Sequence, residues 1–327
     1  MKILLNFLLL IVGFVALIKG ADWFVDGSAG IAKKLRVPGL IIGLTIVALG
    51  TSAPELAVST SAAIAGSNEI ALSNVVGSNI FNLLVVLGSC AVIRTVPVEE
   101  TAIVKRDFPI SILGTLFVLL VTCSGVIFSG KMFSMGMADQ AGTVYRWLGI
   151  VLIVLFICYI AYLIYDAKKH PQEEDEAEQK PVWQLIALIL IGIALIIAGG
   201  QLVVENAKVI ARAFGMTETL IGLTVVALGT SLPELATSIV AAKKGEVGLA
   251  VGNAIGSNIF NLMLILGVSS AIHPVAVNIA SVYDMFVLIA ISVMTMIFAI
   301  SGKKINRTEG IIMILAYIAE TVFAILR

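Results

Sequence analysis

Two carboxylates stand in the middle of long apolar stretches of this chain. Glu55 ends the sequence GTSAPE and Glu234 ends GTSLPE, each within a run long enough to cross a membrane. A carboxylate in the interior of a bilayer costs at least about 2.5 kcal/mol, and such residues mark ion or proton pathways. The Thr and Ser of each motif add hydroxyl oxygens to the carboxylate. Ligand sets made only of oxygen suit hard cations, above all Ca²⁺ and Na⁺.

A proline precedes each carboxylate. Pro54 has no N–H, and its ring clashes with the carbonyl of Gly50; Pro233 does the same to Gly229. Each helix should break there and leave carbonyl oxygens without their helical hydrogen bonds. Such unsatisfied backbone is tolerated at membrane depth only where it is buried in protein or lines a cavity. The alternative is an S-x-x-E capping box. A Gln would cap as well, so two Glu residues favour a cation partner.

A second motif, GSNIFN, also occurs twice and places polar side chains on one helix face. A Ser and an Asn lie four residues apart in each copy and should face the same way; they are Ser78, Asn82, Ser257 and Asn261. Asn79 and Asn258 fall roughly 100° away on a 3.6-residue turn and would instead brace helix packing. The two polar stripes predict part of the cation site.

The elements that carry these motifs are repeated. GLTIVALGTSAPELA at Gly43 matches GLTVVALGTSLPELA at Gly222, and the offset of 179 residues also separates Asn74 from Asn253 at the start of the second motif. With the same offset, the N-terminal apolar run corresponds in sequence to residues 182–210. We therefore expect that run to be a retained helix and not a cleaved signal peptide.

Composition and run length predict an all-α integral membrane protein. Only 13% of the 327 residues are charged, against about 25% in soluble domains. Ten apolar runs are long enough to span a bilayer. They cover roughly residues 3–31, 39–65, 70–93, 108–128, 147–165, 182–210, 218–241, 247–272, 285–301 and 309–326.

Five spans in each repeat require the second repeat to enter the membrane from the opposite side, which gives the inverted-topology repeat common in transporters. We expect a first five-helix repeat at 1–165, an acidic linker at 166–181 and a second, inverted repeat at 182–327, which together form one membrane domain. Helices 2 and 7 are the broken ones. The site is expected near the midplane, where the repeats meet.

Lys and Arg in the connecting loops give the orientation. Fourteen lie on one side and six on the other. The positive-inside rule then places both termini outside and the 166–181 loop in the cytoplasm of a multi-pass cell-membrane protein.

Other features exclude some functions. Lys19, Asp22 and Asp26 lie toward the end of the first span, where snorkelling or mutual pairing explains them. A formal net charge of zero argues against nucleic acid as a partner. No nucleophile–base pair, phosphate loop or His/Cys metal cluster is evident, so we expect neither an enzyme nor a cofactor. The expected partners are the lipid bilayer and the transported ions, with no obligate protein partner.

The two long motifs resemble the paired alpha repeats of the sodium/calcium exchangers of the calcium/cation antiporter superfamily. The resemblance implies alternating access, with Ca²⁺ and several Na⁺ competing for one set of sites. It implies that Glu55 and Glu234 bind Ca²⁺ and that the carbonyls of Thr51 and Thr230 complete that site. It further implies two flanking Na⁺ sites. One consists of Ser52, Ser78 and the Ala48 carbonyl, and the other of Ser231, Ser257 and the Ala227 carbonyl. The amides of Asn82 and Asn261 would lie at the centre.

This chain departs from part of the family pattern. Some relatives carry Asp at the position of Asn261, so a role that needs a third carboxylate is in doubt. We expect Na⁺/Ca²⁺ exchange that is electrogenic and independent of K⁺. We also expect no calcium-gated regulation of the eukaryotic kind, because only a short linker joins the repeats. The alternatives are a Ca²⁺/H⁺ antiporter of the same superfamily, which typically carries GNA-type motifs, and a cation channel, which needs a continuous file of weak sites.

Overall fold

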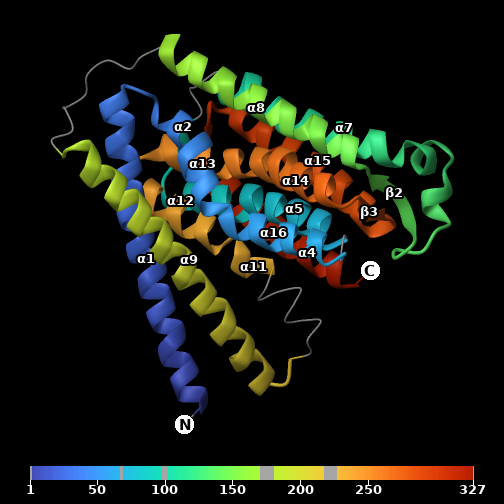
Figure 1. Ribbon diagram of the computed structural model, residues 1–327, viewed down its shortest axis with the longest axis horizontal. Helices are drawn as coiled ribbons and strands as arrows, with labels where there is room; N and C mark the ends of the chain where they lie inside the picture. Colours follow the sequence, from blue (N-terminus) through green and yellow to red (C-terminus); the bar gives the residue numbers. More distant parts are fainter. Residues whose placement is uncertain (1, 67–68, 98–101, 170–179, 217–226, 327) are drawn as a thin grey trace. The chain divides into compact units, whose positions relative to one another are not determined.

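The computed structural model describes residues 2–66, 69–97, 102–169, 180–216 and 227–326, and is mostly helical (Figure 1). The helices of the first half, in chain order, are α1 (Lys2–Leu35), α2 (Gly39–Ile42), η1 (Gly43–Val47), α3 (Ala48–Thr51), α4 (Ala53–Ile64), α5 (Glu69–Phe81), η2 (Asn82–Leu87), α6 (Gly88–Ile93), η3 (Ile103–Asp107), α7 (Phe108–Phe128), η4 (Lys131–Phe133) and α8 (Arg146–Lys169). Those of the second half are α9 (Val182–Ala213), α11 (Ala227–Thr230), α12 (Leu232–Lys244), α13 (Val247–Ile259), η6 (Phe260–Ile265), α14 (Leu266–Ile272), α15 (Ile279–Ser301) and α16 (Arg307–Leu326).

Four short strands lie in the connections between helices. Strand β1 (Val96–Pro97) pairs antiparallel with β4 (Lys304–Ile305), and β2 (Gln140–Val144) pairs antiparallel with β3 (Val275–Asn278). Each pair joins a loop of the first half to a loop of the second half. The sequence patterns did not predict these strands, because they are only two to five residues long.

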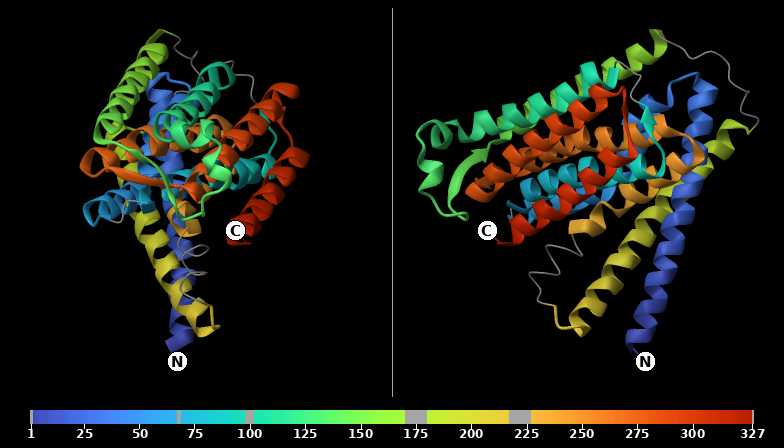
Figure 2. Two further views of the ribbon diagram at one scale, coloured as in Figure 1. Left: turned by 90° about the vertical axis from the view of Figure 1, so that its right-hand side faces the viewer. Right: turned by 180° about the vertical axis from the view of Figure 1, so that it is seen from behind.

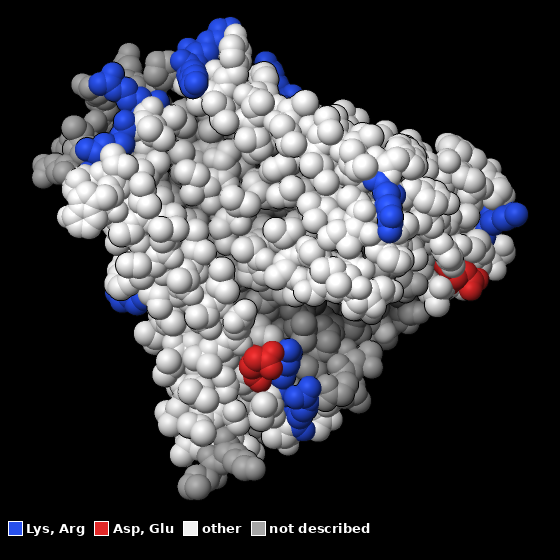
Figure 3. All heavy atoms as spheres, in the orientation of Figure 1, with Lys and Arg blue, Asp and Glu red and all other residues white. Residues whose placement is uncertain are grey.

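Most of the expected membrane spans are present. Within the described residues, eight helices are long and apolar enough to cross a membrane, and a ninth span forms if one bent pair is counted. That pair is Gly39–Thr51 with Ala53–Ile64, bent by 50°, which confirms the predicted break in helix 2. The expected span 218–241 begins outside the described residues, so the count of ten spans stays a prediction. Its described part is broken at Ser231, between α11 and α12. Most of the face in Figure 3 is uncharged, as lipid contact requires.

The chain forms two compact units, and each draws on both sequence repeats. The first unit comprises Met1–Pro54 and Leu163–Ala254; the second comprises Glu55–Tyr162 and Ile255–Arg327. In the first unit, α1 and α9 lie side by side (Figures 1 and 2). Glycines allow this close approach: a Cβ on Gly20 would lie 2.8 Å from the carbonyl oxygen of Gly192, and one on Gly192 would lie 2.9 Å from that of Gly20.

A second glycine contact in the first unit brings the broken helix against α13. A Cβ on Gly43 would lie 2.7 Å from the carbonyl oxygen of Leu249 and 2.9 Å from the Cα of Gly252. Only glycine leaves room for two backbones at this distance. Helix α13 is thereby held beside η1, and α3, which follows η1, ends with the Gly50 and Thr51 of GTSAPE.

In the second unit, α15 packs on α7 and α5, and α16 packs on α6 and η2. Two wide π-helical turns interrupt the helices that carry GSNIFN: η2 begins at Asn82, and η6 contains Asn261. π-Turns are rare and occur often at functional sites. Nothing in the apolar pattern predicts them, because the pattern fixes the buried face but not the hydrogen-bond register.

Candidate functional site

The break in each motif has the same local geometry. Ser52 separates α3 from α4 with φ −81° and ψ 7°, and Ser231 separates α11 from α12 with φ −92° and ψ 6°. Both angles lie in the sparsely occupied bridge region between helix and strand. Each break lies two residues before its proline, so the proline occupies the second position of the following helix. There its missing N–H removes no helical bond.

The serine of the second motif does not cap its helix with its side chain, and the Ser52 hydroxyl contacts a glutamate of the other repeat. The backbone N–H of Ser52 donates to the carbonyl of Ala48 at 3.0 Å, so it is already used. Ser231 is the N-cap of α12, but its side chain makes no capping hydrogen bond. The hydroxyl of Ser52 instead donates to Oε1 of Glu234 at 2.9 Å.

In the first unit, the residues near Glu234 form a buried cluster of oxygen and amide groups. The Thr51 hydroxyl donates to Oδ1 of Asn253 at 2.9 Å. Nδ2 of Asn253 lies 2.9 Å from the Ser238 hydroxyl and 3.3 Å from the carbonyl oxygen of Glu234. Each of these side chains is at most 2% exposed. An ionised carboxylate buried this deeply requires a compensating positive charge.

The remaining predicted ligands of the first unit are only partly described. Thr230 is half-buried and Ser231 is fully buried. The carbonyl oxygen of Ala48 accepts a hydrogen bond from the Ser52 N–H. The Thr51 hydroxyl lies 3.4 Å from the same carbonyl oxygen. Ala227 is the first residue of α11 and directly follows residues outside the described part of the chain.

In the second unit, Glu55 has surroundings that match those of Glu234. It is 1% exposed, and Nδ2 of Asn74 lies 3.4 Å from its carbonyl oxygen and 2.9 Å from the Ser59 hydroxyl. The predicted ligands on the GSNIFN helices are also buried, with no more than 4% of each exposed: Ser78, Asn82, Ser257 and Asn261. Glu55 and Glu234 therefore belong to different units with equivalent local environments.

The predicted packing role of the middle asparagines is confirmed. Nδ2 of Asn79 donates to the carbonyl of Asn258 at 3.2 Å, and Nδ2 of Asn258 donates to the carbonyl of Asn79 at 3.2 Å. Asn261 adds a bond from its Nδ2 to Oδ1 of Asn79 at 3.0 Å. Neither Nδ2 nor Oδ1 of Asn82 has a hydrogen-bond partner within the described residues. One central amide is thus anchored, and the other keeps both polar atoms available for a ligand.

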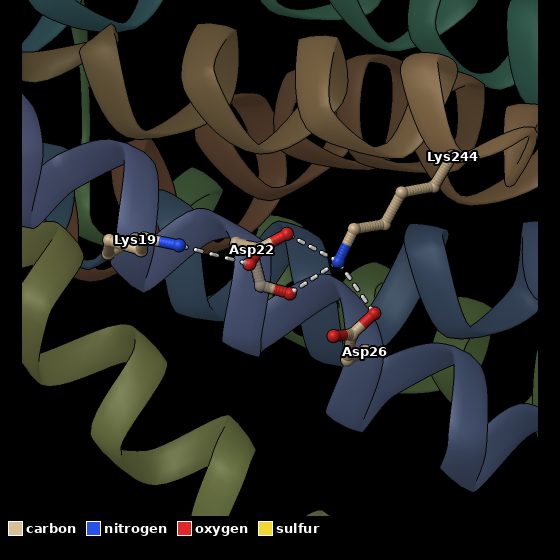
Figure 4. A network of polar contacts seen from close by, with 4 residues as sticks. All are labelled: Lys19, Asp22, Asp26 and Lys244. Atoms are coloured by element: carbon tan, nitrogen blue, oxygen red, sulfur yellow. Dashed lines mark hydrogen bonds and ion pairs between the residues drawn. The ribbon is translucent and has the colours of Figure 1, made fainter.

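The charged residues of the first span form an ion-pair cluster (Figure 4). Nζ of Lys244, at the end of α12, lies 2.6 Å from a carboxylate oxygen of Asp22 and 2.6 Å from one of Asp26. Nζ of Lys19 lies 4.0 Å from Asp22. Partial burial lowers the pKa of Lys244, but hydrogen bonds to Asp22 and Asp26 outweigh it and raise that pKa above its usual value. The expected pairing is confirmed, with Lys244 as the unforeseen partner.

Sequence reasoning missed Asn74 and Asn253. Each lies four residues before the serine of GSNIFN, so the stripe of polar residues on one helix face is one turn longer than the predicted Ser and Asn pair. Their partners Ser59 and Ser238 likewise follow the glutamates by four residues. The described residues hold no group of three or more His, Cys, Asp or Glu side chains that could bind a metal. A cation here would be bound mainly by hydroxyl, amide and carbonyl oxygens with few carboxylates.

Known proteins resemble the chain over almost its whole length. CaxA of Alkalimonas amylolytica is 40% identical over 320 residues, which cover 94% of this chain and 95% of that protein. The sodium/calcium exchanger MaX1 of Methanosarcina acetivorans is 34% identical, with 97% of each chain covered.

A solved structure is also similar to this chain over almost its whole length. The sodium-calcium exchanger NCX_Mj, in crystals soaked without Na⁺ and Ca²⁺, superposes with a TM-score of 0.81 at 32% identity and covers 99% of this chain and 100% of that one. The family described as sodium/calcium exchanger protein matches residues 5–165 and 184–326. The chain is therefore a multi-pass membrane protein that belongs to the sodium/calcium exchanger family.

Proposed function

We propose that this protein exchanges Na⁺ for Ca²⁺ across the membrane by alternating access. The observation that carries the proposal is the burial of Glu55 and Glu234, 1% and 0% exposed, in equivalent surroundings of hydroxyl and amide groups. A buried carboxylate without a counter-charge would be neutralised by a proton. Two carboxylates match the charge of one Ca²⁺. The relatives named as sodium/calcium exchangers support the same ions.

The hydroxyl groups favour Na⁺ as the coupling ion. Ser52 already contacts a carboxylate oxygen of Glu234, and Ser231 is buried at the equivalent break. A hydroxyl offers oxygen lone pairs to a cation, whereas proton exchange needs only the titratable glutamates. We place Na⁺ at Ser52, Ser78 and the Ala48 carbonyl, and at Ser231, Ser257 and the Ala227 carbonyl. Ca²⁺ is placed at Glu55, Glu234 and the carbonyls of Thr51 and Thr230, and Asn82 and Asn261 complete the ligand set.

The competing function is Ca²⁺/H⁺ exchange, and ion flux separates the two. We expect proteoliposomes loaded with Na⁺ and diluted into Na⁺-free buffer to accumulate ⁴⁵Ca²⁺, and liposomes with an acid interior and no Na⁺ not to do so. Uptake driven by the pH gradient alone would identify a Ca²⁺/H⁺ antiporter. Flux down the Ca²⁺ gradient that needs neither Na⁺ nor protons on the opposite side would identify a channel.

We expect exchange to be independent of K⁺. Asn82 and Asn261 are 1% and 0% exposed and are neutral amides, so they add no negative charge to that of the two glutamates. A K⁺ bound together with Ca²⁺ would be a further buried positive charge without a counter-ion, at a cost of several kcal/mol. The measurement is Na⁺-driven ⁴⁵Ca²⁺ uptake at clamped potential with K⁺ or choline as the balancing cation. Equal rates are expected, and an absolute need for K⁺ would show that another group supplies negative charge.

We also propose the orientation given by the loop charges, with both termini outside and residues 166–181 in the cytoplasm. The organisation proposed on the sequence repeat remains two inverted halves, 1–165 and 182–327, within one membrane domain. An epitope tag after Arg327 should react with antibody on intact cells. A tag accessible only from the cytoplasm would reverse the assignment.

A further inference from the structure

Asn253 and Asn74 hold the backbone of the two glutamates in the same way. Each asparagine directs its Nδ2 at a glutamate carbonyl oxygen, at 3.3 Å for Glu234 and 3.4 Å for Glu55. Each also donates to the serine hydroxyl one turn further along the glutamate's helix, and both of these distances are 2.9 Å. The two repeats thus place an amide against the first turn of α12 and of α4.

Asn253 has a further contact that closes a ring of residues. Its Oδ1 accepts the Thr51 hydroxyl at 2.9 Å, and Ser52, the next residue, donates its hydroxyl to Glu234 at 2.9 Å. The ring runs from Thr51 to Asn253, to the backbone of Glu234, through its side chain to Ser52, and back along the chain. Thr51, Glu234 and Asn253 are 0% exposed, and Ser52 is 2% exposed. The amide therefore ties the backbone of Glu234 to the break in the other repeat, where Ser52 holds the carboxylate.

The chemistry of this position requires an amide. The carbonyl of Glu234 can only accept, so the atom facing it must be the amide nitrogen, and the atom facing the Thr51 hydroxyl is then the amide oxygen. A carboxylate of the same shape would place an oxygen against that carbonyl. An apolar residue at this position would leave the Thr51 hydroxyl and the Glu234 carbonyl without the hydrogen bonds that Asn253 makes to them.

We propose that Asn253, and Asn74 in the first repeat, are positioning residues that fix the glutamate carboxylates for Ca²⁺ without themselves binding it. This inference rests on the proposed function of Glu55 and Glu234. Partners that orient a ligand in this way typically change metal affinity about 10–100-fold when they are removed. Asn253→Ala should therefore raise the dissociation constant for Ca²⁺ about 10–100-fold.

Ca²⁺ titration of the purified full-length protein in detergent, by calorimetry, tests the proposal. The matched control is Asn206→Ala, which removes another buried asparagine whose Nδ2 donates only to the Leu202 carbonyl of its own helix, at 2.7 Å, among the described residues. We expect Asn206→Ala to bind Ca²⁺ like the wild type. In liposomes, Asn253→Ala should raise the KM for Ca²⁺ by the same factor while the maximal rate changes much less. A purely structural asparagine would lower the amount of active protein and leave KM unchanged.

The outcomes separate this inference from the proposed function. If Glu234→Gln binds Ca²⁺ like the wild type, the proposed function is wrong. If Glu234→Gln loses Ca²⁺ binding but Asn253→Ala keeps the wild-type dissociation constant, only the positioning role is wrong. If Asn253→Ala does not fold, Asn74→Ala decides, because Asn74 is half-buried and its loss costs less. A wild-type dissociation constant for Asn74→Ala would then overturn the proposal.

Discussion

Glu234→Gln should abolish Ca²⁺ transport while the protein still folds, and Glu55→Gln should do the same. Glutamine keeps the size of glutamate and its hydrogen-bonding oxygen, so the Ser52 hydroxyl keeps an acceptor at its 2.9 Å contact with Glu234. The charge is what changes. Ca²⁺ beside a single carboxylate leaves one positive charge uncompensated in a buried site, and breaking a buried ion pair costs about 3–5 kcal/mol. That energy corresponds to a loss of more than about 100-fold in affinity.

The measurement is Na⁺-driven ⁴⁵Ca²⁺ uptake, with monodispersity and thermal stability in detergent as the test of folding. Glu205→Gln is the matched control, because the Glu205 side chain is 70% exposed and pairs only with Lys208 within the described residues, at 2.8 Å. It should transport at the wild-type rate. Robust exchange by Glu55→Gln or Glu234→Gln would mean that the carboxylates only cap the N-termini of their helices.

Transport should respond to membrane potential. The proposed ligand set has two carboxylates shared by Ca²⁺ and Na⁺, and the hydroxyl groups at both breaks provide further positions for Na⁺. If more than two Na⁺ exchange for each Ca²⁺, every cycle moves net positive charge. A potential of 100 mV then shifts the equilibrium by about 2.3 kcal/mol per net charge, or about 50-fold.

Valinomycin and a K⁺ gradient can clamp the potential while the Na⁺ gradient is held constant. With Na⁺ leaving the liposomes and Ca²⁺ entering, an inside-positive potential should accelerate ⁴⁵Ca²⁺ uptake and an inside-negative potential should slow it. Choline in place of K⁺ on both sides, without valinomycin, is the control for K⁺ itself. Identical uptake at all clamped potentials would require an electroneutral cycle of two Na⁺ for each Ca²⁺.

The sequence predicts the helices and the first break well, because both follow from local chemistry. Apolar runs must be helical in a bilayer, and the expected run 70–93 coincides with the candidate span Ile70–Ile93. The proline of GTSAPE places the first break to within two residues, at Ser52. The break in GTSLPE has similar backbone angles at Ser231, although the start of that span lies outside the described residues.

Contacts between distant parts of the chain are what the sequence does not predict. The bond from Thr51 to Asn253 joins residues 202 positions apart, and no periodicity encodes such a pairing. The π-turns that begin at Asn82 and Phe260 depend on a local change of hydrogen-bond register that apolar spacing does not record. The assignment of ligands to individual ions rests on the resemblance to the exchanger family and on the chemistry of the side chains. The proposed experiments test it.

The asparagine exchange between Asn79 and Asn258 bears on the ancestry of the chain. The two residues occupy the same position in the two sequence repeats, and each donates to the other's carbonyl at 3.2 Å. Two copies of a single chain make such reciprocal contacts across a two-fold axis. A half-length precursor would carry this asparagine in both copies and could form both bonds without any further substitution. Joining the copies into one gene would raise the effective concentration of the second half and leave the contact itself unchanged.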